Sequence, residues 1–233
     1  MKTVHFVRHG ETEQNKDGIW QGHTNTQLSK TGKAQAKLLS KRINLKNQTV
    51  FTSDLARAKE TAYFLSDSPN VRENLREINV GDFTGKSVKE TYSNNLDIFD
   101  ALQYDTYVFP NGESVQEFKL RVQKEVDHIF DNIDEDSECV VVTHGFFIGT
   151  AIGLVLGFNQ YPYPIGNIQN TSISTVIKRD SVMQVNKFND AIHLPNSYID
   201  YPAKDKSRIL TFIRHGQTDS NTQGVWQGHV DNP

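Results

Sequence analysis

Two histidines stand where short apolar runs of the sequence end, and a glycine follows each of them. His9 comes after the run TVHFVR, and His144 comes after the run ECVVVT. A neutral imidazole can attack phosphorus and carry the phosphoryl group covalently. The glycines, Gly10 and Gly145, have no side chain, so backbone N–H groups there can approach the same phosphate oxygens.

Two arginines accompany these histidines. Arg8 directly precedes His9, and Arg57 follows a third apolar run, TVFTS. Because a guanidinium contacts phosphate oxygens in pairs, two arginines and two histidines at one point would form a small, strongly positive phosphate pocket. Each feature alone is weak evidence, since a single strand-end histidine is more often structural. Their joint placement favours phosphate chemistry.

The elements that must position these side chains are strands that alternate with helices. We expect strands over residues 3–8, 49–53 and 138–143, and the last is apolar enough to be buried on both faces. The carboxyl ends of such strands meet at one edge of an open sheet, which is where ligands bind. Helices are expected over residues 29–43, 54–66 and 114–133 and in the apolar stretch 146–158, and a closing hairpin over 171–177 and 181–188.

This order predicts an α/β protein, a three-layer α/β/α sandwich around a mostly parallel (mixed) sheet. Ser29 is expected to cap one helix, and Ser114-x-x-Glu117 forms a capping box for another. Residues 86–112 are irregular and aromatic, and we expect them to form a small cap over the C-terminal strand edge. Their aromatic side chains either form apolar walls for a substrate or pack the cap onto the domain, and the sequence supports both interpretations equally.

Composition excludes several classes of protein. The 233 residues carry a net charge of −3, so no nucleic-acid or membrane surface is expected. No apolar run is long enough to span a bilayer. Cys139 is the only cysteine, so no internal disulfide can form, and we expect a cytoplasmic protein with this thiol buried in a strand. His5, His9 and His23 do not form a convincing metal-ligand set, so neither a metal nor another cofactor is expected.

Five blocks of the chain resemble, in order and spacing, the histidine phosphatase (phosphoglycerate mutase-like) superfamily. The resemblance covers nearly all of residues 2–195. Its blocks are FVRHGETEQNKDGIWQGHTNTQLSKTGKAQA, TSDLARAKETA, LREINVGDFTG, PNGESVQEFKLRV and VVVTHG.

The resemblance implies a role for each matched residue. His9 matches the nucleophile that becomes phosphohistidine, and Glu77 matches the acid that protonates the leaving oxygen. An alkoxide is a poor leaving group, so a proton donor beside the bond fits this chemistry. The other matched positions bind phosphate or substrate: Arg8, Arg57 and His144 in the phosphate pocket, and Asn15, Gln21, Gly22 and Gly145 around it.

The implied activity is hydrolysis of phosphomonoesters without a metal. The loop GxWQGHxxxxLSKTGKAQA resembles the phosphatase branch, including its broad-specificity, fructose-2,6-bisphosphatase-like and α-ribazole-phosphatase-like members. The alternatives are mutase-type phosphoryl transfer and an inactive module that binds phospho-ligands. One departure lies in the loop: the chain has Asn25-Thr26-Gln27-Leu28 where the family usually has Asp-x-Pro-Leu.

The expected partner is a small phosphorylated metabolite. The only basic residues of the cap segment 86–112 are Lys86 and Lys89, against several carboxylates. A highly anionic substrate would need more cations. The cap therefore favours a phosphomonoester with an apolar or neutral body.

The end of the chain repeats its beginning. Residues 207–233 align with residues 1–27, and eleven positions are identical, in order Phe, Arg, His, Gly, Thr, Asn, Gly, Trp, Gln, Gly and His. Identity this dense indicates a tandem repeat. His215 thus matches His9, but no counterpart of Arg57, Glu77 or His144 follows it, so we expect the second copy to be inert by itself.

The repeat divides the chain. We expect a histidine phosphatase domain over residues 1–195, a linker over 196–207 and the truncated start of a second, repeated domain over 208–233. Residues 208–214, RILTFIR, form a β-rich segment of the kind that pairs with open sheet edges. We predict that this segment docks or swaps between chains, so that the protein self-associates through it.

Overall fold

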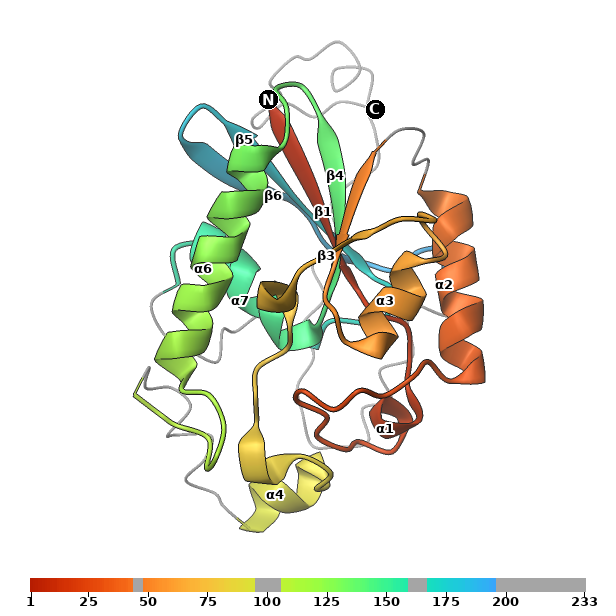
Figure 1. The fold of residues 1–233 in the computed structure, drawn as a ribbon, viewed down its shortest axis with the longest axis vertical. Coiled ribbons are helices and arrows are strands. Elements are labelled where there is room, and N and C mark those ends of the chain that lie inside the picture. Colours follow the sequence, from red (N-terminus) through yellow and green to blue (C-terminus); the bar gives the residue numbers. More distant parts are fainter. Residues whose placement is uncertain (44–47, 95–105, 159–166, 196–233) are drawn as a thin grey trace, which may run out of the picture. The chain divides into compact units, whose positions relative to one another are not determined.

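The computed structural model describes residues 1–43, 48–94, 106–158 and 167–195 (Figure 1). The described residues form a six-stranded sheet of order β3-β2-β4-β1-β5-β6. β3, β2, β4 and β1 run parallel to one another, whereas β5 runs antiparallel to both of its neighbours, β1 and β6. This arrangement confirms the predicted mixed sheet. The strands are β1 (Lys2–Arg8), β2 (Thr49–Thr52), β3 (Asn70–Val71), β4 (Glu138–Thr143), β5 (Ile173–Arg179) and β6 (Val182–Asp190).

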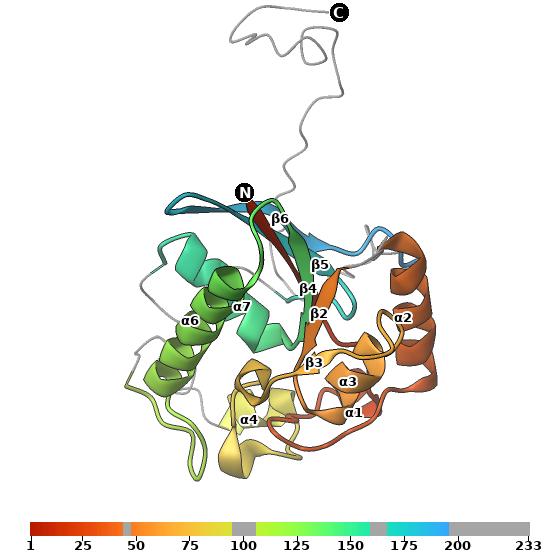
Figure 2. The same cartoon turned by 45° about the horizontal axis from the view of Figure 1, so that its top comes forward.

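Helices cover both faces of this sheet (Figures 1 and 2). α6 (Val115–Asn132) and α7 (Gly145–Val155) lie on one face, and α2 (Lys30–Arg42) and α3 (Ala56–Ala62) lie on the other. The side chains of β4 divide between them, because successive residues of a strand point to opposite faces. Cys139 and Val141 pack with α6 and α7, whereas Val140 and Val142 pack with α2 and α3. The expected burial of this strand on both faces is confirmed.

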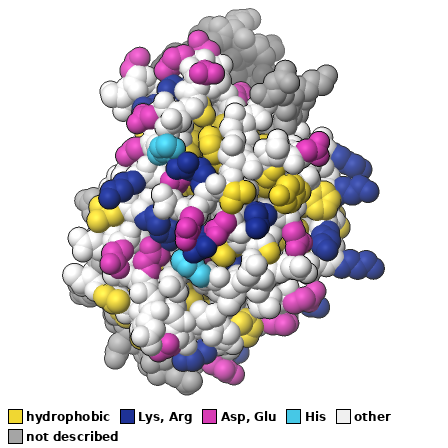
Figure 3. All heavy atoms as spheres, in the orientation of Figure 1, with side chains coloured by type: hydrophobic (Ala, Val, Ile, Leu, Met, Phe, Trp, Pro, Cys, Tyr) yellow, Lys and Arg dark blue, Asp and Glu magenta, His cyan; other side chains and the backbone are white. Residues whose placement is uncertain are grey.

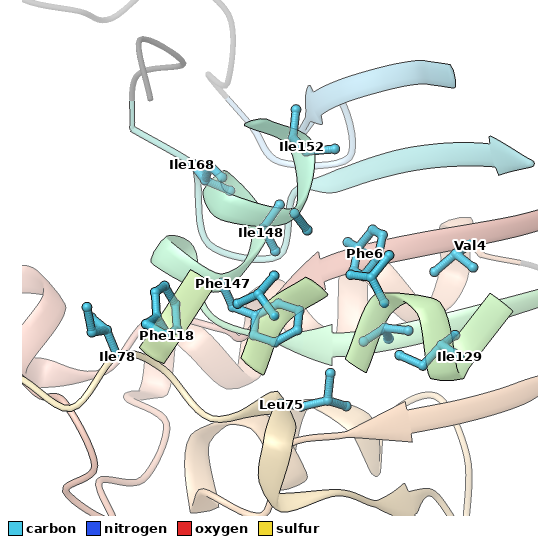
Figure 4. Packing of buried hydrophobic residues seen from close by; sticks show 14 of the residues in the cluster. Val4, Phe6, Leu75, Ile78, Phe118, Ile129, Phe147, Ile148, Ile152 and Ile168 are labelled. Atoms are coloured by element: carbon cyan, nitrogen blue, oxygen red, sulfur yellow. The ribbon is translucent and has the colours of Figure 1, made fainter. Parts of the chain in front are cut away.

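The larger core cluster fixes β1 and β4 against α6 and α7 (Figure 4). Phe6 of β1, Phe118 and Ile129 of α6, and Phe147 of α7 are fully buried. Each such side chain contributes about 1.5–3 kcal/mol relative to an exposed one. This packing holds the ends of the two central strands in place, and the candidate site lies directly beyond those ends.

The helix starts follow local sequence signals in two cases. The hydroxyl of Ser29 accepts a hydrogen bond from the backbone N–H of Gly32 at 3.0 Å, and Ser114 with Glu117 forms the predicted capping box. α3 begins at Ala56, two residues later than predicted. Its N-cap residue, Leu55, makes no side-chain capping bond, and the carboxylate of Asp54 before it pairs with Arg76.

The cap segment is less irregular than predicted, because it contains the helix α4 (Val88–Asn94). α4 lies at the same end of the molecule as α1 (Glu13–Lys16), beyond the carboxyl ends of the parallel strands (Figures 1 and 2). The backbone of Val88 donates to the carbonyl of Gly18 at 2.8 Å, which ties the cap to the loop after His9.

Two cap aromatics pack inward. Phe109 is fully buried, and the ring of Tyr107 meets it edge-on at a centroid distance of 5.1 Å. Phe109 thus packs onto the domain, as one of the two interpretations predicts, and Tyr107 is half-buried against it. Residues 95–105, which include Phe99 and Tyr104, lie outside the described residues.

The chain divides into two compact units, Met1–Ser197 and Tyr198–Pro233. All described residues belong to the first unit. The predicted linker, 196–207, and the predicted repeat, 208–233, lie outside them. The sequence did not predict β3 or the short 3-10 turns η1 (Glu73–Leu75) and η2 (Gly81–Phe83). β3 and η1 precede Glu77 in the chain, and η2 follows it.

Candidate active site

The carboxyl ends of the central strands bring three segments of the chain together. Arg8 pairs in register with Thr143, and the backbone N–H of His9 donates to the Thr143 carbonyl at 2.9 Å. On the other side of β4, the N–H of Ser53 donates to the Val142 carbonyl at 3.0 Å. The residues that follow β1, β2 and β4 therefore meet at one edge, as the sequence predicts.

The imidazole of His9 is oriented by its own loop. Its Nδ1 lies 2.7 Å from the carbonyl oxygen of Gly10. A carbonyl can only accept, so Nδ1 carries the proton and Nε2 keeps its lone pair. The ring is 3% exposed, and burial, followed by the positive charges of Arg57 and Arg8, holds the pKa of His9 well below its ordinary value. His9 therefore carries a neutral imidazole whose Nε2 keeps its lone pair.

Gly10 is required by the packing of the same loop. Its backbone N–H donates to the hydroxyl of Thr61 on α3 at 2.9 Å. A Cβ at this position would lie 2.7 Å from the carbonyl oxygen of Gly32 on α2, which is closer than real contacts allow. α2 and α3, on one face of the sheet, thus fix the position of Gly10, whose carbonyl orients the His9 ring.

Arg57 reaches the site from α3. Its side chain is 1% exposed, and its Nη1 and Nη2 donate to the carbonyls of Thr24 at 2.7 Å and Gly22 at 2.8 Å. Burial lowers the pKa of Arg57 to about 10, so the guanidinium remains charged at neutral pH. These bonds leave Nε buried without a partner.

Arg8 approaches from β1. Its Nη1 donates to the carbonyl of Ile168, and its Nε is buried without a partner. Burial lowers the pKa of Arg8, and the negative charge of Glu77 opposes that shift. A Cβ on Gly145 would lie 3.5 Å from this Nε, an ordinary contact distance, so Gly145 packs beside the Arg8 side chain.

His144 stands at the start of α7 and is fully buried. Its Nε2 lies 2.9 Å from the hydroxyl of Ser53, and its ring centroid lies 5.2 Å from that of His9. Burial and the charge of Arg57 hold the pKa of His144 well below its ordinary value. In the tautomer in which Nε2 accepts from the Ser53 hydroxyl, the ring proton lies on Nδ1, and that atom has no partner among the described residues.

Among the described residues, three buried nitrogens at this edge find no hydrogen-bond partner: Arg8 Nε, Arg57 Nε and His144 Nδ1. An unpaired buried donor costs about 1–3 kcal/mol, and more when it is charged. An anion with several acceptor oxygens suits the two arginine donors, and it suits His144 in the tautomer that carries its proton on Nδ1. The unpaired nitrogens therefore indicate a phosphate site more specifically than the presence of two arginines and two histidines does.

Glu77 lies on the segment between η1 and η2 and is half-buried. Its Oε2 accepts from the backbone N–H of Phe146 at 3.2 Å, and its Oε1 accepts from that of Ile78 at 3.1 Å. Burial raises the pKa of Glu77, and these bonds and the charge of Arg57 oppose the shift. A raised pKa favours the protonated form that a general acid needs.

Two residues that the sequence did not single out for this role hold the backbone of Glu77. Its carbonyl accepts from His23 Nε2 at 2.8 Å and from Arg121 Nη2 at 3.2 Å. Arg121 is itself paired with Glu113 through two bonds of 2.9 and 2.8 Å. Arg121 and Glu113 lie in the PNGESVQEFKLRV block, which is the signal that could have identified them.

The remaining loop residues present amide groups to the site. The Oε1 of Gln21 accepts from the hydroxyls of Thr12 at 3.0 Å and Thr26 at 2.7 Å, which leaves its NH2 group to donate. Gly22 has φ +47°, a conformation that side chains rarely adopt. Thr26 belongs to the stretch that departs from the family pattern, and its neighbour Asn25 accepts from the N–H of Ala56 at 2.7 Å.

Other chemistries find less support in the part of the chain that the structure describes. No group of three or more His, Cys, Asp or Glu side chains there could hold a metal ion. Burial raises the pKa of Cys139 to about 12, so its thiol stays protonated. None of the described helices could cross a membrane. On the face in Figure 3, acidic and basic side chains are interspersed.

Comparison with known proteins places the chain among histidine phosphatases, in agreement with the resemblance of its motifs. The family model for the histidine phosphatase superfamily (branch 1) matches residues 4–191. A metal-independent phosphoserine phosphatase of Arabidopsis thaliana is 30% identical over 199 residues, covering 81% of this chain and 82% of that protein. A probable phosphoglycerate mutase of Enterobacter is 28% identical over 213 residues, covering 88% and 99%. The structure of a phosphoserine phosphatase mutant of Entamoeba histolytica with phosphoserine matches with a TM-score of 0.75 at 28% identity, covering 84% and 100%.

Proposed function

The chain belongs to the histidine phosphatase superfamily (branch 1), and we propose that it hydrolyses small phosphomonoesters through a phosphohistidine on His9. The observation that carries the proposal is the orientation of the His9 ring. Its Nδ1 is held by the Gly10 carbonyl, so Nε2 is the attacking atom. Phosphatases are among the relatives, and one of them is named a metal-independent phosphoserine phosphatase.

In the first step, Nε2 of His9 attacks phosphorus in line with the bond to the leaving oxygen. The unpaired donors of Arg8, Arg57 and His144 stabilise charge on the phosphoryl oxygens. Asn15, Gln21, Gly22 and Gly145 line the same loop ends and bind the phosphate or the substrate. Protonated Glu77 donates its proton to the leaving alcohol.

In the second step, Glu77 is left as a carboxylate and accepts a proton from water. The water attacks phosphorus, the bond to Nε2 breaks, and inorganic phosphate leaves. Both steps need positioning and charge stabilisation more than new covalent chemistry, which is typical of phosphoryl transfer.

We propose a small substrate whose body is neutral overall. Of the two cap cations, Lys86 lies over the ring of Phe83 at 5.5 Å and is thus partly engaged. In phosphoserine the amino and carboxylate charges cancel, and the names of two relatives contain that substrate. Phosphoserine is therefore the first physiological candidate to assay, beside 3-phosphoglycerate.

The test is hydrolysis of 4-nitrophenyl phosphate at slightly acidic pH by the wild type and by His9→Ala. We expect turnover by the wild type, none above background by the variant, and an acid-labile, base-stable phosphoryl label on wild-type His9 after a brief exposure. A wild type without turnover, or a variant as active as the wild type, would overturn the proposal. With 3-phosphoglycerate, release of inorganic phosphate supports hydrolysis, whereas 2-phosphoglycerate would show a mutase.

We also propose that residues 208–233 are a second copy of the nucleophile motif, separated by a linker over 196–207 from the catalytic domain over 1–195. The repeated sequence supports this division. We propose a cytoplasmic location, which the single buried cysteine, Cys139, supports because no internal disulfide can form.

A further inference from the structure

The loop over residues 167–172 packs against the nucleophile loop from the β5 side of β1. The backbone N–H of Thr171 donates to the carbonyl of Arg8 at 2.9 Å, and the N–H of Arg8 donates to the carbonyl of Ser172 at 3.3 Å. The carbonyl of Ile168 accepts from the Arg8 guanidinium. This loop therefore touches both the backbone and the side chain of the residue before His9.

One side chain of the loop, that of Asn170, joins two site residues. Its Nδ2 donates to the carbonyl oxygen of His9 at 2.9 Å and to the Oδ1 of Asn15 at 3.3 Å. An amide NH2 has two hydrogens, so both bonds can form at once. Both partners are acceptors, and only a donor at this position suits them.

These bonds also determine which end of the Asn15 amide is free. Its Oδ1 accepts from Asn170 and, at 3.2 Å, from the backbone N–H of Thr12. With the oxygen engaged by two donors, the NH2 group of Asn15 is the end left to donate to an anion. If the Asn15 amide were turned by 180°, its NH2 group would face the N–H of Thr12 and the NH2 of Asn170, and both hydrogen bonds would be lost.

We propose that Asn170 is a positioning residue for phosphoryl transfer. It holds the His9 peptide, and hence the ring that the next carbonyl orients, and it keeps the NH2 of Asn15 directed at the phosphoryl group. The proposal rests on the proposed function, since it assigns Asn170 a task in the same reaction.

The loop that carries Asn170 has an anchor of its own, which makes a control possible. Asn189 on β6 accepts from the N–H of Gln169 at 2.7 Å and donates to the carbonyl of Asn167 at 3.0 Å. It bonds to loop residues other than Asn170 and has φ +51°. Asn189→Gly removes both bonds and tolerates this φ, because glycine has no Cβ.

The main test is Asn170→Asp, which keeps the shape of the side chain and replaces its donor with an acceptor. A carboxylate oxygen in the place of Nδ2 would then face both the His9 carbonyl and Asn15 Oδ1. We expect kcat for phosphomonoester hydrolysis to fall about 100-fold, the cost of a small misplacement of the reacting group. We expect KM to stay within about threefold, since the lost interaction matters in the transition state. kcat should fall less in Asn170→Ala, because this change removes the donor without placing a negative charge beside the two acceptor oxygens.

A double-mutant cycle separates positioning from general loosening. If Asn170 acts partly through Asn15, the losses in Asn15→Ala and Asn170→Ala will not add in the double variant. Asn189→Gly should keep kcat near the wild-type value. Additive losses in the cycle, or a loss in Asn189→Gly as large as in Asn170→Asp, would overturn the proposal.

The outcomes distinguish this proposal from the function on which it rests. A wild type that turns over and is silenced by His9→Ala, together with a fully active Asn170→Asp, would reject the role of Asn170 and leave the phosphatase intact. A wild type without turnover would reject both. Thermal unfolding of each variant accompanies the kinetics, and if Asn170→Asp does not fold, Asn170→Ala and the cycle decide.

Discussion

The chain carries a similar sequence motif twice, in residues 6–27 and 212–233, with eleven identical positions. The first copy is followed by Arg57, Glu77 and His144, whereas the second has no counterpart of them within the chain. Comparing the two separates what the motif supplies from what its surroundings supply.

The motif supplies only part of what determines the chemistry of His9. It provides His9 itself, the carbonyl of Gly10 that orients its ring, and Arg8. The depressed pKa of His9 comes first from burial and then from Arg57, which lies on α3. The hydroxyl of Thr61 holds the Gly10 N–H from the same helix. We therefore expect that removing a group outside the motif, such as Arg57 or the Thr61 hydroxyl, lowers the activity or the stability of the first copy.

The largest expected contrast is between the two histidines themselves. His9→Ala should lower kcat by about 10⁴-fold or more, since it removes the atom that forms the covalent intermediate. His215→Ala, the matched control in the repeat, should leave kcat unchanged. Steady-state hydrolysis of 4-nitrophenyl phosphate checks both, and a comparable loss in His215→Ala would break the comparison.

Glu77→Gln should have the next largest effect, because it removes the acid that the second copy also lacks. For an alkyl phosphate such as phosphoserine we expect kcat to fall about 10²–10⁴-fold. 4-Nitrophenolate leaves without a proton, so that substrate should still phosphorylate His9 while water attack is slowed. A burst of nitrophenolate and an accumulated phosphohistidine would then appear in rapid mixing. Equal losses on both substrates with no burst would argue against Glu77 as the acid.

The pH profile of kcat/KM tests the same two groups together. Activity requires neutral His9, so it rises as pH passes the pKa of His9, which burial and the arginines hold well below 6.5. It requires protonated Glu77, so it falls as pH passes the pKa of Glu77, which burial raises above 4.5. The maximum should lie on the acidic side of neutrality. Glu77→Gln should remove the falling limb, and Glu135→Gln, an exposed carboxylate at the far end of β1, should retain it.

The sequence could predict the elements that are marked locally. The strand ends at Arg8 and Thr143 follow from apolar runs that stop at polar residues, and the helix starts after Ser29 and Ser114 follow from capping side chains. The start of α3 could not be predicted in this way, since the partner of Asp54 lies 22 residues further along.

The supports of the site were missed for a related physical reason. Ser53 reaches His144 across 91 residues of sequence, and Asn170 reaches His9 across 161. Serine, threonine and asparagine are common in loops, and nothing in their local pattern shows which partner the fold will bring near. Glu77 was identified only through the resemblance, since its local sequence suits a solvated carboxylate equally well.

Thr61→Val should produce a smaller effect on the first copy, mainly on its stability. The hydroxyl of Thr61 is fully buried and accepts from the Gly10 N–H, so valine leaves that donor unpaired. We expect a loss of about 1–3 kcal/mol in the free energy of unfolding, measured by urea denaturation. Thr61→Ser keeps the hydroxyl and should retain more of the stability. If the two variants lose the same amount, the hydrogen bond is not what holds the loop.

Removal of residues 204–233 should have the smallest effect on catalysis, because every residue assigned a catalytic role precedes them. We expect kcat and KM to be unchanged. We nevertheless predict that residues 208–214 matter for association, since their composition is typical of a β-strand and exposed strand edges tend to pair. Size-exclusion chromatography should therefore show a change in oligomeric state or solubility. An identical elution profile would contradict self-association through this segment, and a loss of activity would show that the second copy contributes to the first.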